Sequence, residues 1–382
     1  MKSLGVAILT MMAIMFSSPS SVRGQNPVEN ADHVSYISTS QHVIETWATD
    51  EAGTLSSFID ATVASGATVL ASTTSSMTSF GYGTNILVYY QGTDGDIYEI
   101  RYDTRLGWNV FNLTSLSGGP AAATGTTLTS ILNGEHGYIF YIGSNSHVYE
   151  LTWNSSNQWV TTDLTTTTGA PNAGSVVSLT SFLFGGDLEV MYLTSTGVVQ
   201  QMYLNSGSSW KTYAASTAAG APPCPLGNVL TGFKSPDGNA HVFYTASTGY
   251  VQELYSTSGT WRTDVVGGGT VVTSASFDGY VHAFVSEPGS TITEYYIQSQ
   301  TGGTWSDDAM ADIGSPSTKS IFQAYTNGKY AFRVWYNSGY VIAGEWVVPN
   351  CTFAGGPYWC WESTQAASGP APVSNALTAT YW

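Results

Sequence analysis

The chain has 382 residues, of which 42% are hydrophobic, 13% aromatic and only 9% charged, with 41 glycines. Its formal net charge of −16, from 26 acidic and 10 basic side chains, argues against nucleic acid and anionic membranes as partners. The Gly-rich, aromatic composition without a long amphipathic helical pattern predicts an all-β fold.

The first 24 residues have the pattern of a secretory signal peptide. Lys2 supplies a positive charge, residues 4–16 are apolar, and small residues precede Gln25. We therefore expect a secreted mature chain of residues 25–382 that forms a single domain. Loss of Lys2 and Arg23, with no acidic residue, would change the formal charge from −16 to −18. No later apolar run approaches the roughly 20 residues of a membrane-spanning helix, so we expect no membrane insertion.

A hairpin unit recurs along the mature chain, and residues 241–261, HVFYTASTGYVQELYSTSGTW, show it most clearly. An aromatic strand, a Thr-Gly turn and an alternating strand are followed by a Gly-x-Trp turn that begins an outer strand. We call the last residue of the aromatic strand the anchor, and a polar residue usually follows it nine positions later. The seven anchors are Tyr36, Tyr90, Tyr141, Tyr192, Tyr244, Val285 and Trp335.

A short Leu-Thr-Ser-like strand precedes each hairpin except the first. Clear examples begin at Leu128, Leu179 and Leu230, and the missing copy occurs at the C-terminus as Leu377-Thr378-Ala379. The pattern predicts a seven-bladed β-propeller of four-stranded antiparallel blades, with six blades as the alternative. We expect residues 377–380 to pair beside residues 33–36 and close the ring, since an open ring would leave unpaired strand edges.

Three cysteines and three sequons fit an oxidising compartment. Cys351 and Cys360 flank a Gly/Pro-rich segment that suits a local disulfide. Cys224 is left over, as a free thiol or an intermolecular bridge. The acceptor sequons for N-glycosylation begin at Asn112, Asn154 and Asn350.

The hairpin pattern resembles the fungal fucose-specific lectins and their bacterial relatives. Residues 88–108 (VYYQGTDGDIYEIRYDTRLGW) and 243–261 (FYTASTGYVQELYSTSGTW) carry the likeness, which extends over nearly the whole mature chain. The resemblance implies a propeller that binds fucose in pockets between neighbouring blades. In such pockets an Arg of the second strand and a Glu of the third bond to sugar hydroxyls, and aromatic residues of the next blade stack on the ring.

The resemblance assigns sugar-binding roles to residues of this chain. The glutamates are Glu45, Glu99, Glu150, Glu253 and Glu294. The tryptophans that begin the outer strands are Trp108, Trp159, Trp210, Trp261 and Trp305. A second aromatic residue follows the Glu only at Tyr102 and Trp153.

The arginine of the family pattern is missing from most repeats. Two positions before the anchors the chain has Val34, Val88, Ile139, Val190, Val242 and Ala283. Only Arg333 fits, and its repeat has Ala343 where Glu is expected. Because this removes a charge-assisted donor, the sequence leaves the sugar undetermined.

We expect the best pockets to combine Glu45 with Tyr102 and Trp108, and Glu99 with Trp153 and Trp159. Weaker candidates combine Glu150 with Trp210, and Glu253 with Trp305. The alternative interpretation is that the tryptophans pack the blades together and that the glutamates are solvated or hydrogen-bonded at a blade edge.

The function predicted from the sequence is secreted, non-catalytic binding of glycans, possibly fucosylated, without a cofactor or metal. Binding would be multivalent if several pockets work, and the oligomeric state is left open. One alternative is a propeller glycoside hydrolase, although Asp94, Asp96, Asp307 and Asp308 fall in turn-like or surface contexts. The other is a structural or protein-binding propeller whose sugar sites have decayed.

Overall fold

The fold is known from a computed structural model. It describes residues 27, 31–48, 57–74, 76–153, 158–174, 178–205, 207–277, 279–287, 292–298 and 304–309, and then the strand segments 322–326, 332–337, 342–353, 356–365 and 372–381. The predicted signal peptide and Asn154 lie outside these residues. For most of the chain after residue 309, only the backbone is described.

The described strands form four-stranded antiparallel sheets, as the sequence predicts. The first complete meander contains β4 (Met77–Tyr82), β5 (Asn85–Gln91), β6 (Ile97–Asp103) and β7 (Gly107–Asn112). The second contains β8 (Thr129–Asn133), β9 (His136–Ile142), β10 (Val148–Trp153) and β11 (Trp159–Asp163). The third contains β12 (Leu179–Phe184), β13 (Asp187–Leu193), β14 (Val199–Leu204) and β15 (Lys211–Ala214).

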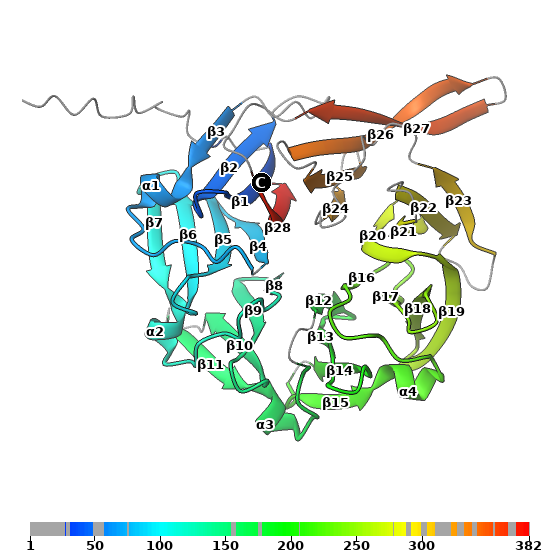
Figure 1. The fold of residues 1–382 in the computed structure, drawn as a ribbon, viewed down its shortest axis with the longest axis horizontal. Coiled ribbons are helices and arrows are strands. Elements are labelled where there is room, and N and C mark those ends of the chain that lie inside the picture. Colours follow the sequence, from blue (N-terminus) through cyan, green and yellow to red (C-terminus); the bar gives the residue numbers. More distant parts are fainter. Residues whose placement is uncertain are drawn as a thin grey trace, which may run out of the picture.

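Three more meanders follow along the chain (Figure 1). One contains β16 (Leu230–Lys234), β17 (Ala240–Thr245), β18 (Tyr250–Thr257) and β19 (Thr260–Gly268). The next contains β20 (Thr270–Phe277), β21 (Tyr280–Ser286), β22 (Ile292–Gln298) and β23 (Ser306–Ala309). The last contains β24 (Phe322–Thr326), β25 (Phe332–Asn337), β26 (Ile342–Phe353) and β27 (Gly356–Gln365).

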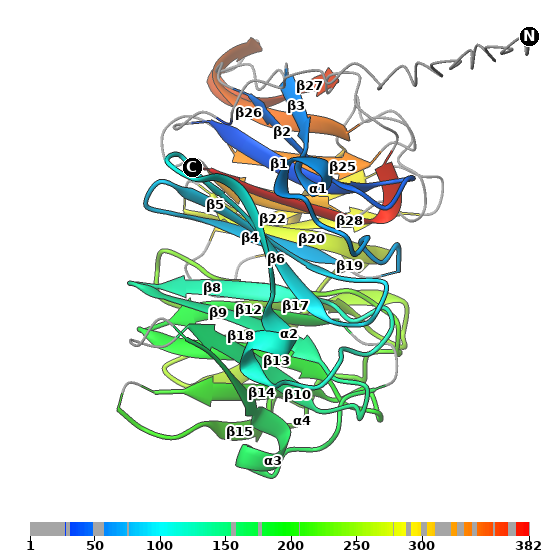
Figure 2. The same cartoon turned by 90° about the vertical axis from the view of Figure 1, so that its left-hand side faces the viewer.

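The remaining sheet joins the two ends of the chain. β28 (Pro372–Tyr381) pairs with β1 (Asp32–Ser38), which continues into β2 (Val43–Ala48) and β3 (Ser57–Asp60). Tyr36 lies opposite Leu377 and His33 opposite Thr380, which is the pairing expected from the repeat. β28 also packs against β24 and β4, the innermost strands of the two neighbouring sheets. Figure 2 shows β28 running beside β1.

The anchors explain why the aromatic strand is the most regular part of the repeat. Tyr90, Tyr141, Tyr192 and Tyr244 are fully buried between sheets. The hydroxyl groups of the last three donate hydrogen bonds to the carbonyl oxygens of Pro120, Pro171 and Pro222, at 3.0, 2.6 and 2.7 Å. Each anchor thus supplies apolar area to the core and also ties down the segment that leads into its own sheet.

The Leu-Thr-Ser-like strands are the innermost strands, and their hydroxyl groups connect neighbouring sheets. Thr78 bonds to Ser130 at 2.7 Å, and Thr129 bonds to Ser181 at 2.8 Å. Thr231 bonds to Ser274 at 2.9 Å. At these three places the repeated motif therefore joins the first strands of successive sheets by a hydroxyl-to-hydroxyl bond, whereas between β12 and β16 the Thr180 hydroxyl donates to the carbonyl oxygen of Gly232 at 3.5 Å.

Four one-turn helices, which the sequence analysis did not predict, follow outer strands: α1 (Ala61–Ser65), α2 (Leu113–Ser117), α3 (Leu164–Thr168) and α4 (Ala215–Ala219). Asp60, Asn112 and Asp163 cap the first three through their side chains. Each helix ends at a glycine in the left-handed conformation, such as Gly118 at φ 69°. None of the helices in the described ranges is long and apolar enough to cross a membrane.

Candidate functional site

Strand register decides which side chain faces the repeated glutamate. Glu99 lies opposite Tyr89, the residue before the anchor, and Glu253 lies opposite Phe243 in the same way. Directly opposed residues of an antiparallel pair point to one face, and side chains alternate along each strand. The position two before the anchor therefore points away from the glutamate. Its occupants are core residues with no exposed surface: Val34, Val88, Ile139, Val190, Val242 and Ala283.

The residue that shares a face with the glutamate is three positions before the anchor. This position is occupied by His33, Leu87, Tyr138, Glu189, His241 and His282. None of them is an arginine, so these six repeats have no arginine either two or three positions before the anchor. The sequence shows the spacing along the strand but not the cross-strand register, which only the structure gives.

Three of the glutamates form buried pairs with these histidines. The Nδ1 atoms of His33, His241 and His282 lie 2.8, 2.6 and 2.6 Å from carboxylate oxygens of their partners, which are Glu45, Glu253 and Glu294. Glu45 also accepts a hydrogen bond from the hydroxyl of Ser35 and has no exposed surface. Both residues of each pair belong to the same sheet, so the carboxylate already has a partner within that sheet.

We call the contact between two neighbouring sheets beside a repeated glutamate, or beside the residue at the same position, a junction. At two other junctions, the tryptophan of the next sheet donates a hydrogen bond to this residue. The indole nitrogen of Trp210 donates to Glu150 at 3.1 Å, and that of Trp261 donates to the side-chain oxygen of Gln201 at 2.9 Å. Gln201 in turn donates to Glu189 at 2.8 Å. Burial raises the pKa of Glu150 to about 7 and that of Glu189 to about 8, and these hydrogen bonds only partly oppose the shifts.

The tryptophans that begin the outer strands also pack against the preceding sheet. Trp159 meets the ring of Tyr89, Trp210 that of Phe140 and Trp305 that of Phe243, edge to face at centroid distances of 6.4, 6.0 and 5.9 Å. These contacts match the packing interpretation of the tryptophans.

Tyr102 and Trp108 lie at the junction that contains Glu45. Their rings are 5.2 Å apart, and both pack with Ile37 and Val43 of the preceding sheet. Tyr102 is buried, and the indole nitrogen of Trp108 is buried without a hydrogen-bond partner. The structure thus brings together the residues of this predicted pocket, but as packed core. Trp305 likewise has a buried indole nitrogen without a partner at the Glu253 junction.

Glu99 has different neighbours. Arg101, two residues later on β6, donates from Nε at 2.8 Å and from its terminal nitrogen Nη2 at 2.6 Å, both to Oε1. The guanidinium also lies over the ring of Phe111 in its own sheet and over that of Trp153 in the next, at 5.1 and 5.2 Å. The sequence analysis missed Arg101 because it expected an arginine on the second strand. Alternation places Glu99 and Arg101 on the same face of β6.

The other oxygen of Glu99 and the hydroxyl of Tyr89 are buried without hydrogen-bond partners. The two groups are nevertheless close enough to act on each other both by charge and as a hydrogen-bonding pair, although their geometry is not that of a regular hydrogen bond. Burial raises the pKa of Glu99 while the charge of Arg101 opposes the increase, and burial raises the pKa of Tyr89 as well. Unpartnered buried polar atoms are costly, so this pair indicates a place for a further partner.

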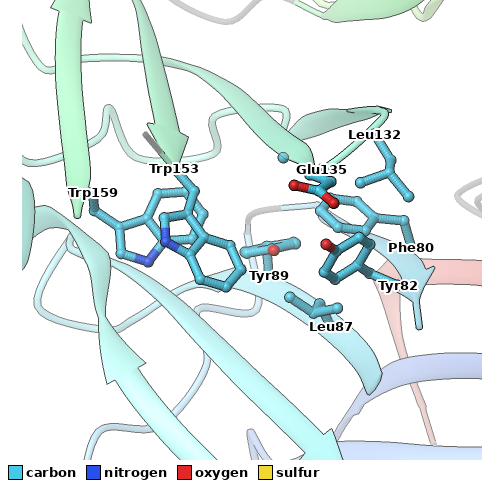
Figure 3. Close-up of a pocket in the computed structure, with 9 residues that line it drawn as sticks. Phe80, Tyr82, Leu87, Tyr89, Leu132, Glu135, Trp153 and Trp159 are labelled. Atoms are coloured by element: carbon cyan, nitrogen blue, oxygen red, sulfur yellow. The ribbon is translucent and has the colours of Figure 1, made fainter. Parts of the chain in front are cut away.

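A hollow that is partly open to solvent lies between the β4–β7 and β8–β11 sheets, and Tyr89 is one of the residues that line it. In Figure 3 the rings of Trp153 and Trp159 lie to one side of Tyr89 and Glu135 lies to the other. The two tryptophans are stacked, with centroids 6.3 Å apart. The remaining lining residues are Phe80, Tyr82, Leu87, Leu132 and Gly137.

The hollow is lined by two residues of one predicted pocket. Trp153 and Trp159 form one wall, and the third residue, Glu99, interacts with the lining residue Tyr89. Arg101 adjoins it through Trp153. Aromatic faces beside a carboxylate and a guanidinium can bind a ligand that has both C–H surfaces and hydroxyl groups.

The last meander corrects one expectation. Glu345 lies opposite Val334, the residue before the anchor Trp335, while Ala343 lies opposite Tyr336. Glu345, not Ala343, therefore occupies the glutamate position. The hairpin between β25 and β26 therefore contains more residues than the sequence analysis assumed when it placed Ala343 at the glutamate position. The side chains of this sheet are outside the described part of the chain.

The cysteines and sequons fall in different environments. Cys224 is a free, buried thiol whose pKa burial raises to about 12, which agrees with the free-thiol alternative. Asn112 donates from its side chain to Asp96 and Tyr98, at 2.7 and 3.0 Å, while it caps α2. Cys351 and Cys360 lie on the paired strands β26 and β27, but their side chains, like that of Asn350, are not described.

The family model for the fungal fucose-specific lectins matches residues 70–277, which is more than half of the chain and includes this hollow. Among curated proteins, no sequence matches the chain. The resemblance noted in the hairpin sequence is thus confirmed by an independent comparison of the whole pattern.

Solved structures share the fold at low sequence identity. A lectin from Burkholderia pseudomallei has a TM-score of 0.64 at 14% identity and covers 92% of this chain and 98% of its own. The six-bladed β-propeller lectin of Aleuria aurantia has a TM-score of 0.54 at 16% identity, over 79% of this chain and 98% of its own. AofleA from Arthrobotrys oligospora has a TM-score of 0.53 at 17% identity, over 82% and 90%.

Proposed function

The chain belongs to the fungal fucose-specific lectin family, and from this premise we propose that it is a secreted, non-catalytic protein that binds glycans. The proposed site is the hollow between the β4–β7 and β8–β11 sheets. The observation that carries the proposal is the pair of buried, unpartnered polar atoms, one on Glu99 and one on Tyr89, beside a wall formed by Trp153 and Trp159.

The chemistry of this site suits a saccharide. Trp153 and Trp159 offer apolar faces to the C–H side of a sugar ring, and Glu99 offers an acceptor for a hydroxyl group. Arg101 commits two of its five N–H groups to Glu99, which leaves others available as donors. The lectin of Aleuria aurantia has been solved with α-methyl-L-fucoside, so fucosylated glycans are the first ligands to test.

The sheets support a propeller as the scaffold of this site. We propose a closed, seven-bladed ring in which β28 supplies the inner strand of the blade that contains β1–β3. The contacts of β28 with β1, β24 and β4 support this closure.

Binding without turnover fits the contacts of the acidic turn residues. Asp94 accepts hydrogen bonds from the Asp96 backbone and from Tyr98, and Asp96 accepts one from Asn112. These bonds hold the turn together, as the structural interpretation of these carboxylates requires. Measurable turnover of a chromogenic glycoside would favour the hydrolase alternative.

The test of the proposed function is a glycan array with the mature chain, residues 25–382. We expect a signal on at least one class of saccharide, with fucosylated glycans included, and loss of that signal in Trp153→Ala. Leu106→Ala is the control, because Leu106 is 78% exposed in the turn between β6 and β7. The absence of binding to every saccharide would contradict the proposal and favour a protein-binding propeller.

Secretion and the Cys351–Cys360 disulfide belong to the same proposal. β26 and β27 pair with Cys351 opposite Tyr358 and Cys360 opposite Val348, with an irregularity between them. The two cysteines thus lie on adjacent strands but not opposite each other, so the bridge would require a local shift in this pairing. Mass spectrometry of the secreted chain without reduction should show this single bridge and a free Cys224.

A further inference from the structure

The repeats place similar polar residues at successive junctions, but their hydrogen-bond states differ. Of the repeated glutamates in the described part of the chain, only Glu99 has a buried oxygen without a hydrogen-bond partner. The hollow is lined by Tyr89, which interacts with that same glutamate. Two independent observations thus single out one junction among sequences that look alike.

At the Glu150 and Gln201 junctions, a saccharide would have to displace the tryptophan of the next sheet. Trp210 and Trp261 are buried and donate their only polar hydrogen to these residues. Trp210 also packs edge-on against Phe140. Opening either junction would break a buried hydrogen bond, and opening the Glu150 junction would also break an aromatic contact, which opposes entry of a ligand.

At the Glu45 and Glu253 junctions, the carboxylate is already held by a histidine of its own sheet. The unpartnered atom there is the single N–H of Trp108 or Trp305, which is buried. One indole donor cannot orient a sugar through paired hydroxyl groups, whereas a carboxylate oxygen beside a guanidinium can. A histidine at the position that faces the glutamate thus takes the carboxylate that a saccharide would otherwise bind.

In the repeat that contains Glu99, a different pair of residues keeps the site open. Leu87 occupies the position that faces the glutamate and lines the hollow without bonding to Glu99. Arg101 bonds to Glu99 from the same strand and uses only one of the two carboxylate oxygens. Stacking on Phe111 and on Trp153, which lines the hollow, fixes the position of the guanidinium.

We infer that, among the described junctions from Glu45 to Glu253, only the junction beside Glu99 binds a saccharide. This inference rests on the proposed function and makes this part of the ring a monovalent binder, although the repeat predicts several sites. Avidity for a glycan-coated surface would then have to come from association of chains.

The test is calorimetric titration of the mature chain with α-methyl-L-fucoside or, if that ligand gives no heat, with the saccharide that gives the strongest array signal. We expect Glu99→Gln to abolish binding and the matched variants Glu150→Gln and Glu253→Gln to leave stoichiometry and affinity unchanged. Tyr89→Phe removes the hydroxyl group beside Glu99 and should weaken binding at least tenfold. This variant replaces Glu99→Gln in the test if Glu99→Gln fails to fold.

The outcomes separate this inference from the proposed function. A lower stoichiometry in folded Glu150→Gln or Glu253→Gln, or full binding in folded Glu99→Gln, would overturn the single-junction inference while the lectin function stood. A wild-type chain that bound no saccharide would overturn both. Stoichiometry near one in the wild type, with loss only in the Glu99 and Tyr89 variants, would support both.

Discussion

At the scale of single residues, Glu99 and Glu189 show how burial gives one residue type different roles. Glu99 is buried with one oxygen bonded to Arg101 and one without a partner. Glu189 is buried with Gln201 as its donor, and its pKa is raised to about 8. The first arrangement leaves a place for a ligand, whereas the second makes the stability of the fold depend on pH.

Arg101→Lys should weaken saccharide binding by about tenfold. A lysine cannot hold Glu99 through two N–H groups or stack between Phe111 and Trp153, so the donors beside the hollow lose their fixed orientation. Arg105→Lys, in the exposed turn of the same hairpin, is the control and should bind normally. Titration of both variants measures the effect, and equal affinities would show that Arg101 does not orient the ligand.

Glu189→Gln should stabilise the protein at pH 8 but have little effect at pH 5. Because the folded pKa of about 8 lies above the value of an unfolded glutamate, the native state binds more protons than the unfolded state between these values. The wild type therefore loses stability as the pH rises from about 4.5 to about 8. The amide keeps an acceptor for Gln201 without a charge, so we expect a gain of roughly 1–3 kcal/mol at pH 8.

Denaturant unfolding of the wild type and Glu189→Gln at both pH values measures this difference. Glu135→Gln, at an exposed position, is the control and should follow the wild type. A variant whose free energy of unfolding tracked that of the wild type across the pH range would show that Glu189 ionises normally in the fold.

At the scale of elements, the shape of the hollow depends on a glycine in β9. A Cβ on Gly137 would lie 2.9 Å from the ring of Phe80, which lines the hollow and packs against Tyr89 at 5.4 Å. The sequence marks this position only as a small residue in a strand. Its role follows from the approach of a ring on a neighbouring sheet.

Gly137→Ala should reduce saccharide binding severalfold while the protein stays folded. The added methyl group would displace the ring of Phe80, and a shifted ring would change the wall of the hollow. Gly268→Ala is the matched control, because a Cβ there meets no atom within 4 Å. Circular dichroism checks folding and titration checks binding, and unchanged affinity would mean that the Phe80 wall does not contact the ligand.

At the scale of the whole molecule, the tail holds the first and last sheets together. Leu377 on β28 is 4% exposed, although it lies close to the end of the chain. β28 contacts the innermost strands of both neighbouring sheets, so it joins parts of the chain that are about 300 residues apart in sequence. Loss of this strand would leave β1 with an unpaired edge.

Leu377→Ala should lower the free energy of unfolding by about 2–4 kcal/mol, the usual cost of truncating a buried leucine. Thermal and denaturant unfolding of this variant would be compared with those of Leu106→Ala, whose side chain is 78% exposed. An effect on stability as small as that of the control would show that the tail strand does not hold the neighbouring sheets together.

The sequence by itself determined the all-β class, the repeating four-stranded unit, the family and the pairing of the C-terminal strand with the first hairpin. These features depend on alternation, turn residues and spacing, which are local and recur several times along the chain. The tertiary structure alone decided that Val88 faces away from Glu99, that Arg101 supplies the guanidinium, and that histidines and tryptophans occupy the other repeated positions. The physical reason is that a hydrogen bond between side chains depends on register and on the approach of neighbouring sheets, and similar repeats can satisfy the same carboxylate with different partners.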